Sequence, residues 1–201
     1  NKKCIKLLGP KYALVDKKFS FFKKRKTQNE KKNRSILVFM GGSDPKKEIL
    51  KAVSGISSVF PKISLMHVVV GKSFQYLREL RNKLKKTKIK NKLYVQTKNM
   101  AKILSSVNLA VLSGGTVTWE KCTLGVPSLV TIQSNNQVKN SYALEKKGAH
   151  IVIGKSERVT SKNYTNKIQA LSPKKINSMS RISSKICDGK GIARVVKKLL
   201  S

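Results

Sequence analysis

Short runs of β-branched and other apolar residues alternate with longer amphipathic stretches from residue 35 to the end of the chain. The short runs have the length of buried strands, and the longer stretches have the apolar spacing that favours helices. The pattern predicts strands at 35–40, 64–70, 92–96, 108–112, 128–132 and 150–153. It predicts helices at 46–59, 74–85, 100–105, 116–124 and 137–147, with three further helix-like stretches between 162 and 200. Strands that alternate with helices build a parallel sheet, so we expect one doubly wound, Rossmann-like α/β domain over residues 35–201.

The first 34 residues do not follow this rhythm, and we interpret residues 1–34 as a linker or arm. A short apolar piece is followed at 17–34 by a strongly basic run. Three phenylalanines in that run, Phe19, Phe21 and Phe22, need a surface to cover them. We therefore expect the arm to pack along the domain.

The chain is strongly basic, because 44 of its 201 residues are Lys or Arg and 9 are Asp or Glu, which gives a net charge of +35 at pH 7. A field of this size attracts polyanions. Only seven of the cations are arginine, however, and direct readout of bases or phosphates relies on arginine forks. A Lys-rich, Arg-poor chain is also typical of an AT-biased genome. We expect a solvated basic surface that binds nucleic acid only non-specifically, with a non-enzymatic polyanion-binding protein as an alternative.

Hydrophobic residues make up 39% of the chain, which is enough for the core of a folded domain. Cys4, Cys122 and Cys187 are too far apart for a metal knuckle or a disulfide framework, and they suit a reducing cytosol. No apolar run approaches the roughly 20 residues of a membrane span, and no signal-peptide core follows the basic start. We expect a cytoplasmic protein. A start at Asn1 rather than Met is compatible with a fragment of a longer protein.

Two glycine-rich turns each connect a predicted strand to a predicted helix. They are Gly41-Gly42-Ser43-Asp44-Pro45 and Ser113-Gly114-Gly115-Thr116. In both turns glycine permits positive φ and close approach, and Asp44 and Pro45 suit the cap and the first position of a helix. The N–H groups that begin such a helix can hold a phosphate at the carboxyl edge of the sheet. The alternative is that paired glycines only make tight turns.

Neither turn is a P-loop or a dinucleotide fingerprint. Gly71-Lys72-Ser73 resembles the end of a P-loop, but Met66 stands where the upstream glycine belongs. The sequence also lacks the GxGxxG of a dinucleotide site.

The acidic residues limit the chemistry further. Asp16, Asp44 and Asp188 are the only aspartates, so no DxD pair exists, and we expect neither a metal nor a cofactor. Glu120 lies about one helical turn behind the second glycine turn, where a carboxylate can accept both hydroxyls of a ribose. An ion pair with Lys121 or another cation is the alternative role of Glu120.

No catalytic residue is predicted from the sequence. His67 and His150 both fall in predicted strands, where a buried structural role is the usual one for histidine. No Ser-His-Asp spacing is present either.

Six short motifs, in this order, resemble those of a known family. They are residues 7–14, 41–45, 100–122, 124–127, 136–137 and 188–191. Over nearly its whole length the chain resembles the C-terminal part of the UDP-2,4-diacetamido-2,4,6-trideoxy-β-L-altropyranose hydrolase family of pseudaminic acid biosynthesis. That family is similar to the spore-coat polysaccharide proteins and to the family 28 glycosyltransferases.

The resemblance implies a GT-B fold, in which two Rossmann-like domains face each other and the C-terminal one holds UDP. This chain would then be the C-terminal, nucleotide-binding half. The resemblance implies that eight residues contact the UDP-sugar: Gly114, Gly115 and Thr116 at the diphosphate, Glu120 at the ribose, Gly42 and Ser43 along the cleft, and Asn136 and Gln137 at the sugar or the α-phosphate.

The reaction of that family is hydrolytic removal of UDP by attack of water at the anomeric carbon, without a metal and with a general base. The family takes its base from a Gly-x-Gly-His loop in the N-terminal domain, and no such loop occurs in residues 1–201. The chain alone is therefore expected to bind UDP without turnover. Either the N-terminal domain is missing, or it is a separate chain, or this chain is a degenerate copy that only binds nucleotide. A family 28-like transferase that passes the sugar to an acceptor remains an alternative, because acceptor choice would lie in that other domain.

Overall fold

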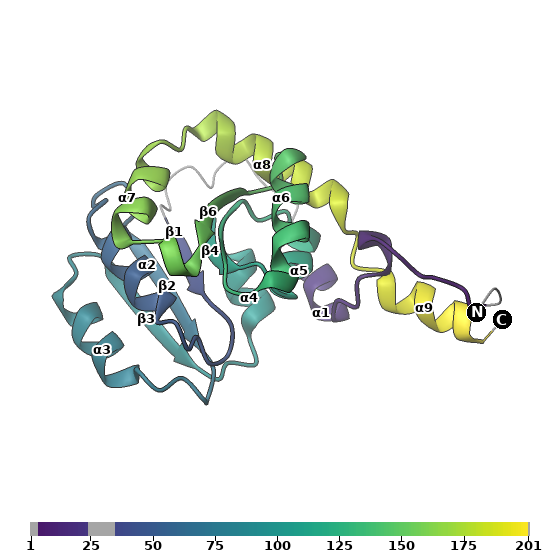
Figure 1. The fold of residues 1–201 in the computed structure, drawn as a ribbon, viewed down its shortest axis with the longest axis horizontal. Coiled ribbons are helices and arrows are strands. Elements are labelled where there is room, and N and C mark those ends of the chain that lie inside the picture. The colour runs from purple at the N-terminus through teal and green to yellow at the C-terminus, as the bar shows by residue number, and fades with distance from the viewer. Residues whose placement is uncertain (1–3, 24–34, 201) are drawn as a thin grey trace.

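A computed structural model describes residues 4–23 and 35–200 of the chain. Its centre is a sheet of six parallel strands in the order β3-β2-β1-β4-β5-β6 (Figure 1). The strands are β1 (Ser35–Phe39), β2 (Leu65–Val70), β3 (Lys90–Val95), β4 (Leu109–Ser113), β5 (Ser128–Ile132) and β6 (Ile151–Lys155). The α-helices are α1 (Lys17–Phe21), α2 (Glu48–Ser57), α3 (Leu77–Lys86), α4 (Met100–Ser105), α5 (Val117–Leu124), α6 (Val138–Lys146), α7 (Ser161–Gln169), α8 (Pro173–Ile186) and α9 (Gly191–Leu199). Short 3-10 helices include η1 (Pro10–Tyr12), η3 (Asn135–Gln137) and η4 (Ser156–Arg158).

The strand order reverses in the middle of the sheet. β1, β2 and β3 follow one another toward one edge, and the chain then returns to place β4 on the other side of β1. The loops after β1 and β4 therefore leave the sheet in opposite directions, which opens a crevice at the carboxyl ends of these two strands. The topology confirms the predicted doubly wound, Rossmann-like sheet.

Alternate residues of each strand contribute to cores on opposite faces of the sheet. Ile36 and Val38 of β1 belong to the core under α2, α3 and α7, whereas Leu37 belongs to the core formed with α4 and α5. Burying each such side chain contributes about 1.5–3 kcal/mol. The near-continuous apolar strands of the sequence are thus explained by a sheet that is covered on both faces.

A buried polar network fixes the start of α2. Glu48 is fully buried, and its carboxylate accepts hydrogen bonds from Tyr164 Oη at 2.7 Å, from Ser156 Oγ at 2.9 Å and from Lys51 Nζ at 2.5 Å. The Tyr164 hydroxyl also lies 2.7 Å from Thr131 Oγ1. These contacts hold α2, α7 and the end of β5 together behind the loop that follows β1.

Several element boundaries differ from the prediction by one to three residues, and two of these differences have a clear physical cause. α2 begins at Glu48 rather than at residue 46, because the Asp44 carboxylate accepts hydrogen bonds from the N–H groups of Glu48 and Ile49. Pro45 is therefore not the first residue of this helix. β3 begins at Lys90 rather than at residue 92, because its parallel pairing with β2 continues through polar residues.

The part of the predicted arm that the structure describes contains a helix the sequence pattern did not predict. α1 is capped by Asp16, whose carboxylate accepts from Lys18 N at 2.8 Å. Phe19 is 6% exposed and joins the core under α4 and α5, whereas Phe21 is 84% exposed. The expected packing is found for Phe19 and not for Phe21. Residues 1–3 and 24–34 of the predicted arm lie outside the described residues.

α9 and the segment around η1 lie side by side and extend away from the sheet, so that the first and last of the described residues are on the same side (Figure 1). Arg194 of α9 donates to the Lys11 carbonyl at 2.8 Å and pairs with Asp188. Across residues 4–23 and 35–200, no helix has both the length and the apolar character that crossing a membrane requires.

Candidate functional site

The first glycine turn follows β1 and ends in a buried carboxylate. Gly41 has a φ of 89°, a conformation that favours glycine. Asp44 is 1% exposed, and its carboxylate accepts from the N–H groups of Glu48 at 3.1 Å and Ile49 at 2.8 Å. Burial raises the pKa of Asp44, and these two N–H groups oppose the rise. The first turn of α2 is therefore already occupied by an anionic side chain.

The second glycine turn leaves the start of its helix open. α5 begins at Val117 after the cap residue Thr116, and no side chain caps it. Among the hydrogen bonds of the described residues, none is donated by the N–H of Gly115, Thr116 or Val117. The N-terminus of a helix attracts anions through such free N–H groups and its dipole. The structure thus distinguishes two turns that look alike in the sequence, because a side chain fills the helix start after the first turn and none fills it after the second.

The two glycines of the second turn are needed for different reasons. A Cβ on Gly114 would lie 2.6 Å from Ser141 Oγ and 3.1 Å from Gln137 Cβ, so Gly114 allows α6 to approach. A Cβ on Gly115 would meet only Ser113 Oγ, at 3.9 Å, so the chain itself leaves this position open. Neither glycine has the positive φ that we expected of this turn.

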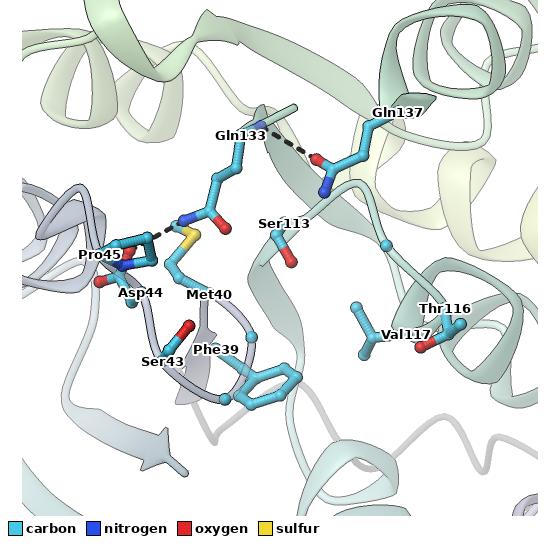
Figure 2. Close-up of a pocket in the computed structure, with 13 residues that line it drawn as sticks. Phe39, Met40, Ser43, Asp44, Pro45, Ser113, Thr116, Val117, Gln133 and Gln137 are labelled. Atoms are coloured by element: carbon cyan, nitrogen blue, oxygen red, sulfur yellow. Dashed lines mark hydrogen bonds between the residues drawn. The ribbon is translucent and has the colours of Figure 1, made fainter. Parts of the chain in front are cut away.

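Two glutamines connect the turns. The side-chain oxygen of Gln137 accepts from the Gly114 N–H at 3.1 Å and from the Gln133 N–H at 3.0 Å. The side-chain amide of Gln133 in turn donates to Asp44 Oδ1 at 2.8 Å. Figure 2 shows both glutamines on the side of the pocket opposite Phe39.

These elements enclose a pocket of about 300 Å³ at the carboxyl ends of β1, β4 and β5. Its volume is at the small end of the range for ligand sites. The residues that line it are Phe39, Met40, Gly41, Gly42, Ser43, Asp44, Pro45, Ser113, Gly115, Thr116, Val117, Gln133 and Gln137 (Figure 2). Five of the predicted site residues meet here: Gly42, Ser43, Gly115, Thr116 and Gln137.

The other three predicted residues are not among those that line the pocket. Gly114 lies directly behind it, bonded to Gln137. Asn136 is exposed, and its side-chain oxygen accepts from Ser134 Oγ at 2.6 Å. Glu120 is half-buried on α5, where burial and then the nearby Asp16 carboxylate raise its pKa.

The sequence reasoning missed Gln133, placed Ser113 in the second glycine turn without a ligand contact, and assigned Asp44 only a capping role. Ser113 ends β4, and Gln133 directly follows β5. Their positions in the sequence could have indicated a place in the site, because polar residues at the carboxyl ends of neighbouring parallel strands meet at one edge of the sheet.

Both histidines lie away from the pocket. His67 is 8% exposed and its Nδ1 lies 3.1 Å from Tyr94 Oη, while His150 is 1% exposed with its Nε2 2.7 Å from the Ser141 carbonyl. Both side chains are therefore buried, as expected for histidines in or next to strands. Among the described residues, no group of three or more His, Cys, Asp or Glu side chains is placed to hold a metal ion.

Comparison with known sequences identifies the family to which this chain belongs. The sequence family described as "Glycosyltransferase family 28 C-terminal domain" matches residues 36–197. The chain belongs to this family. Spore coat polysaccharide biosynthesis protein SpsG from Bacillus subtilis (strain 168) is a relative of this family 28 domain, with 30% identity over 192 residues that cover 93% of the chain and 56% of SpsG.

The family 28 domain is also similar to a further curated protein and to a solved structure. The UDP-2,4-diacetamido-2,4,6-trideoxy-beta-L-altropyranose hydrolase from Campylobacter jejuni is 27% identical over 149 residues, which cover 74% of the chain and 52% of the hydrolase. The crystal structure of Acinetobacter baumannii MurG superposes with a TM-score of 0.75 at 14% identity, covering 92% of the chain and 54% of MurG. The likeness to MurG confirms the Rossmann-like fold expected for one half of a GT-B protein. The chain spans about half the length of these relatives.

Proposed function

We propose that this family 28 domain is the UDP-sugar-binding half of a UDP-sugar hydrolase that releases UDP from a 2,4-diacetamido-2,4,6-trideoxy sugar in nonulosonic (pseudaminic) acid biosynthesis. The observation that carries the proposal is the open N-terminus of α5, which faces a pocket at the reversal of strand order. A diphosphate suits the free N–H groups of Gly115, Thr116 and Val117. The Campylobacter hydrolase supplies the substrate class.

The space around the glycines supports a ligand at this edge. An added Cβ on Gly42 meets nothing within 4 Å, and one on Gly115 meets only an atom at 3.9 Å. Neither residue has a positive φ, so the fold alone does not require glycine at either position. A bound phosphate or sugar that approaches the backbone closely would require it.

The remaining contacts follow from the same placement. Glu120, on the helix whose start holds the diphosphate, would accept the ribose hydroxyls. Gly42 and Ser43 would line the sugar side of the cleft from the opposite turn. Gln137 and Asn136 would contact the sugar or the α-phosphate. In the hydrolysis itself, water attacks the anomeric carbon, the bond from that carbon to the phosphate oxygen breaks, UDP leaves, and a general base outside residues 1–201 takes the proton of the water.

Calorimetric titration with UDP tests the nucleotide site. Gly115→Ala should weaken UDP binding at least tenfold, equivalent to about 1.4 kcal/mol, with the melting temperature unchanged, because the added methyl group meets only the ligand. Gly114→Ala is the contrasting variant, and it should lower the melting temperature because its Cβ would lie 2.6 Å from Ser141 Oγ. Unchanged affinity in Gly115→Ala would exclude the α5 turn as the diphosphate site.

Glu120→Ala tests the ribose contact in the same titration, and it should also weaken UDP binding at least tenfold. Unchanged affinity in this variant would exclude Glu120 as the residue that binds the ribose.

A glycosyltransferase that passes the sugar to an acceptor is the second candidate, and the family description favours it. Both functions use the same half-site for the nucleotide. A product assay on the protein with both halves present separates them, because free sugar supports the hydrolase and a glycosylated acceptor supports the transferase.

We also propose that the other half of the protein covers an apolar surface at the two ends of this chain. This terminal face comprises Ile5, Leu8, Leu14, Ile192, Val196, Leu199 and Leu200, each between 43% and 84% exposed. Three of them, Ile192, Val196 and Leu199, form one stripe of α9. Exposed apolar patches of this kind mark protein interfaces, and the relatives have about as many further residues as this chain matches.

Hydrogen exchange tests this docking surface. The amides of α9 should exchange more slowly in a protein that contains both halves than in this chain alone. Val196→Glu should abolish that protection, whereas Lys197→Glu, at the next exposed position, should leave it intact. Equal exchange in both proteins would exclude the terminal face as the interface, and self-association of the chain alone through this face would assign it to a second copy.

A further inference from the structure

One continuous set of hydrogen bonds spans the pocket from the first glycine turn to the second. Asp44 of the first turn accepts from Gln133 Nε2 at 2.8 Å, and the Gln133 N–H donates to Gln137 Oε1 at 3.0 Å. Gln137 Oε1 also accepts from the Gly114 N–H of the second turn at 3.1 Å. Among the hydrogen bonds of the described residues, none joins the two turns directly. The two glutamines are therefore the hydrogen-bonded connection between them.

Gln133 is held at three of its polar groups. Besides its N–H and its side-chain amide, its backbone carbonyl accepts from Lys46 Nζ at 3.0 Å, and Lys46 itself belongs to the loop after β1. Gln133 comes directly after β5, on the far side of β4 from β1. It therefore attaches the loop after β1 to the end of β5 at two points, one through Asp44 and one through Lys46.

Asp44 depends on this attachment. Its carboxylate is buried, and the two backbone N–H groups of α2 are its other donors. Its backbone has a φ of 43°, which is uncommon for a residue other than glycine. A buried carboxylate that loses a donor is costly, and the loop can relieve that cost by turning Asp44 toward water. The position of the first turn is thus sensitive to the side chain of Gln133.

We propose that Gln133 is a positioning residue that sets the separation of the two glycine turns, and that it thereby controls affinity for a ligand that contacts both. The proposal rests on the proposed function, in which a UDP-sugar reaches from the α5 turn to Gly42 and Ser43. A ligand held only at the α5 turn does not depend on Gln133 in this way. Gly114 is bonded to the side chain of Gln137, which in turn is bonded to the backbone N–H of Gln133. A substitution of the Gln133 side chain leaves this N–H in place.

Gln133→Leu tests the proposal with two probes, UMP and UDP-N-acetylglucosamine. The variant should bind UDP-N-acetylglucosamine at least fivefold more weakly than the wild type and bind UMP within twofold of it. Gln169→Leu, a substitution of an exposed glutamine on α7, is the control and should change neither affinity. Equal loss for both probes, or no loss for either, would overturn the positioning role.

Gln133→Glu adds a readout that a general loss of packing would not produce. At pH 8 it places a second carboxylate against Asp44, and the repulsion should weaken UDP-N-acetylglucosamine binding more than tenfold relative to the wild type. At pH 5.5 one proton shared between the two carboxyl groups restores the hydrogen bond, so the affinity relative to the wild type should recover. A defect that is independent of pH would contradict the proposal.

Amide resonances of the free protein separate this proposal from the proposed function. Gln133→Leu should shift the signals of Gly42 and Ser43 and leave that of Gly114 in place. If the wild type binds neither probe, the proposed function fails while the resonances still report on the connection. If the wild type binds both probes and the resonances of Gly42 and Ser43 do not move, the positioning role fails alone.

Discussion

His150 is a buried neutral base at the start of β6, and it links the stability of the fold to pH. Its Nε2 lies 2.7 Å from the Ser141 carbonyl, and no partner of its Nδ1 is present among the described residues. Burial, and second the charge of Lys121, lowers the pKa of His150 from 6.5 to about 3. The unfolded chain therefore takes up a proton between pH 6.5 and 3 that the folded chain does not bind. Stability is lost as the pH falls through this window.

We expect the titration of His150 to lower the free energy of unfolding by about 2–3 kcal/mol when the pH falls from 7.5 to 4.5. His150→Gln keeps an amide donor for the Ser141 carbonyl and removes the titration. The difference in unfolding free energy between the two pH values should therefore be smaller in the variant by that amount, as measured by urea denaturation. Identical differences in the two proteins would mean that His150 is accessible to protons in the folded state.

At the scale of elements, the docking of α1 on α4 and α5 is carried by one face of a very short helix. Phe19 is 6% exposed in the core under these helices, and Phe21 of the same helix is 84% exposed. Phe19→Ala should therefore lower the free energy of unfolding by about 3–5 kcal/mol. Phe21→Ala is the matched control and should change it by less than about 0.5 kcal/mol. Equal effects of the two substitutions in chemical denaturation would show that α1 is not docked through Phe19.

The elements of the sheet could be predicted from the sequence because their cores are local patterns. The apolar run in β1 is buried on both faces, so hydrophobicity alone marks it. The start of β3 could not be found in this way, because Lys90 lies on a strand at the edge of the sheet and is exposed. α1 was missed for a related reason, since Phe19 is one buried residue in a basic run and its partners lie on α4 and α5.

In the candidate site, too, local features could be predicted from the sequence and contacts between distant residues could not. Paired glycines after a strand could be predicted to form turns, and both turns were found. Which helix start is open could not be predicted, because it depends on Asp44 filling the first turn of α2 and on Gln133, which is 89 residues further along the chain. The surroundings of Glu120 likewise depend on Asp16 at the start of α1. Contacts between distant residues of this kind leave no periodic signal in a single sequence.

At the scale of the whole molecule, the net charge of +35 acts on every anion, and it has to be separated from recognition in the pocket. Charges on the surface are screened over about 10 Å at 0.1 M salt. Binding at the start of α5 would instead depend on a few short N–H contacts in a pocket. The two modes therefore differ in their salt dependence more than in their affinity at low salt.

We expect UDP binding to change by less than about threefold between 50 and 300 mM KCl, because few counterions are released when a small ligand enters the pocket. Binding of poly-uridine should fall by about a hundredfold over the same range if four phosphates are neutralised by lysines, since affinity for single strands decreases with a slope of about −0.7 per phosphate. UMP serves as the control for the second phosphate. UDP affinity that falls as steeply as that for poly-uridine would mean that the lysine surface, and not the α5 turn, captures the nucleotide, and the chain would then be a polyanion-binding protein on a glycosyltransferase fold.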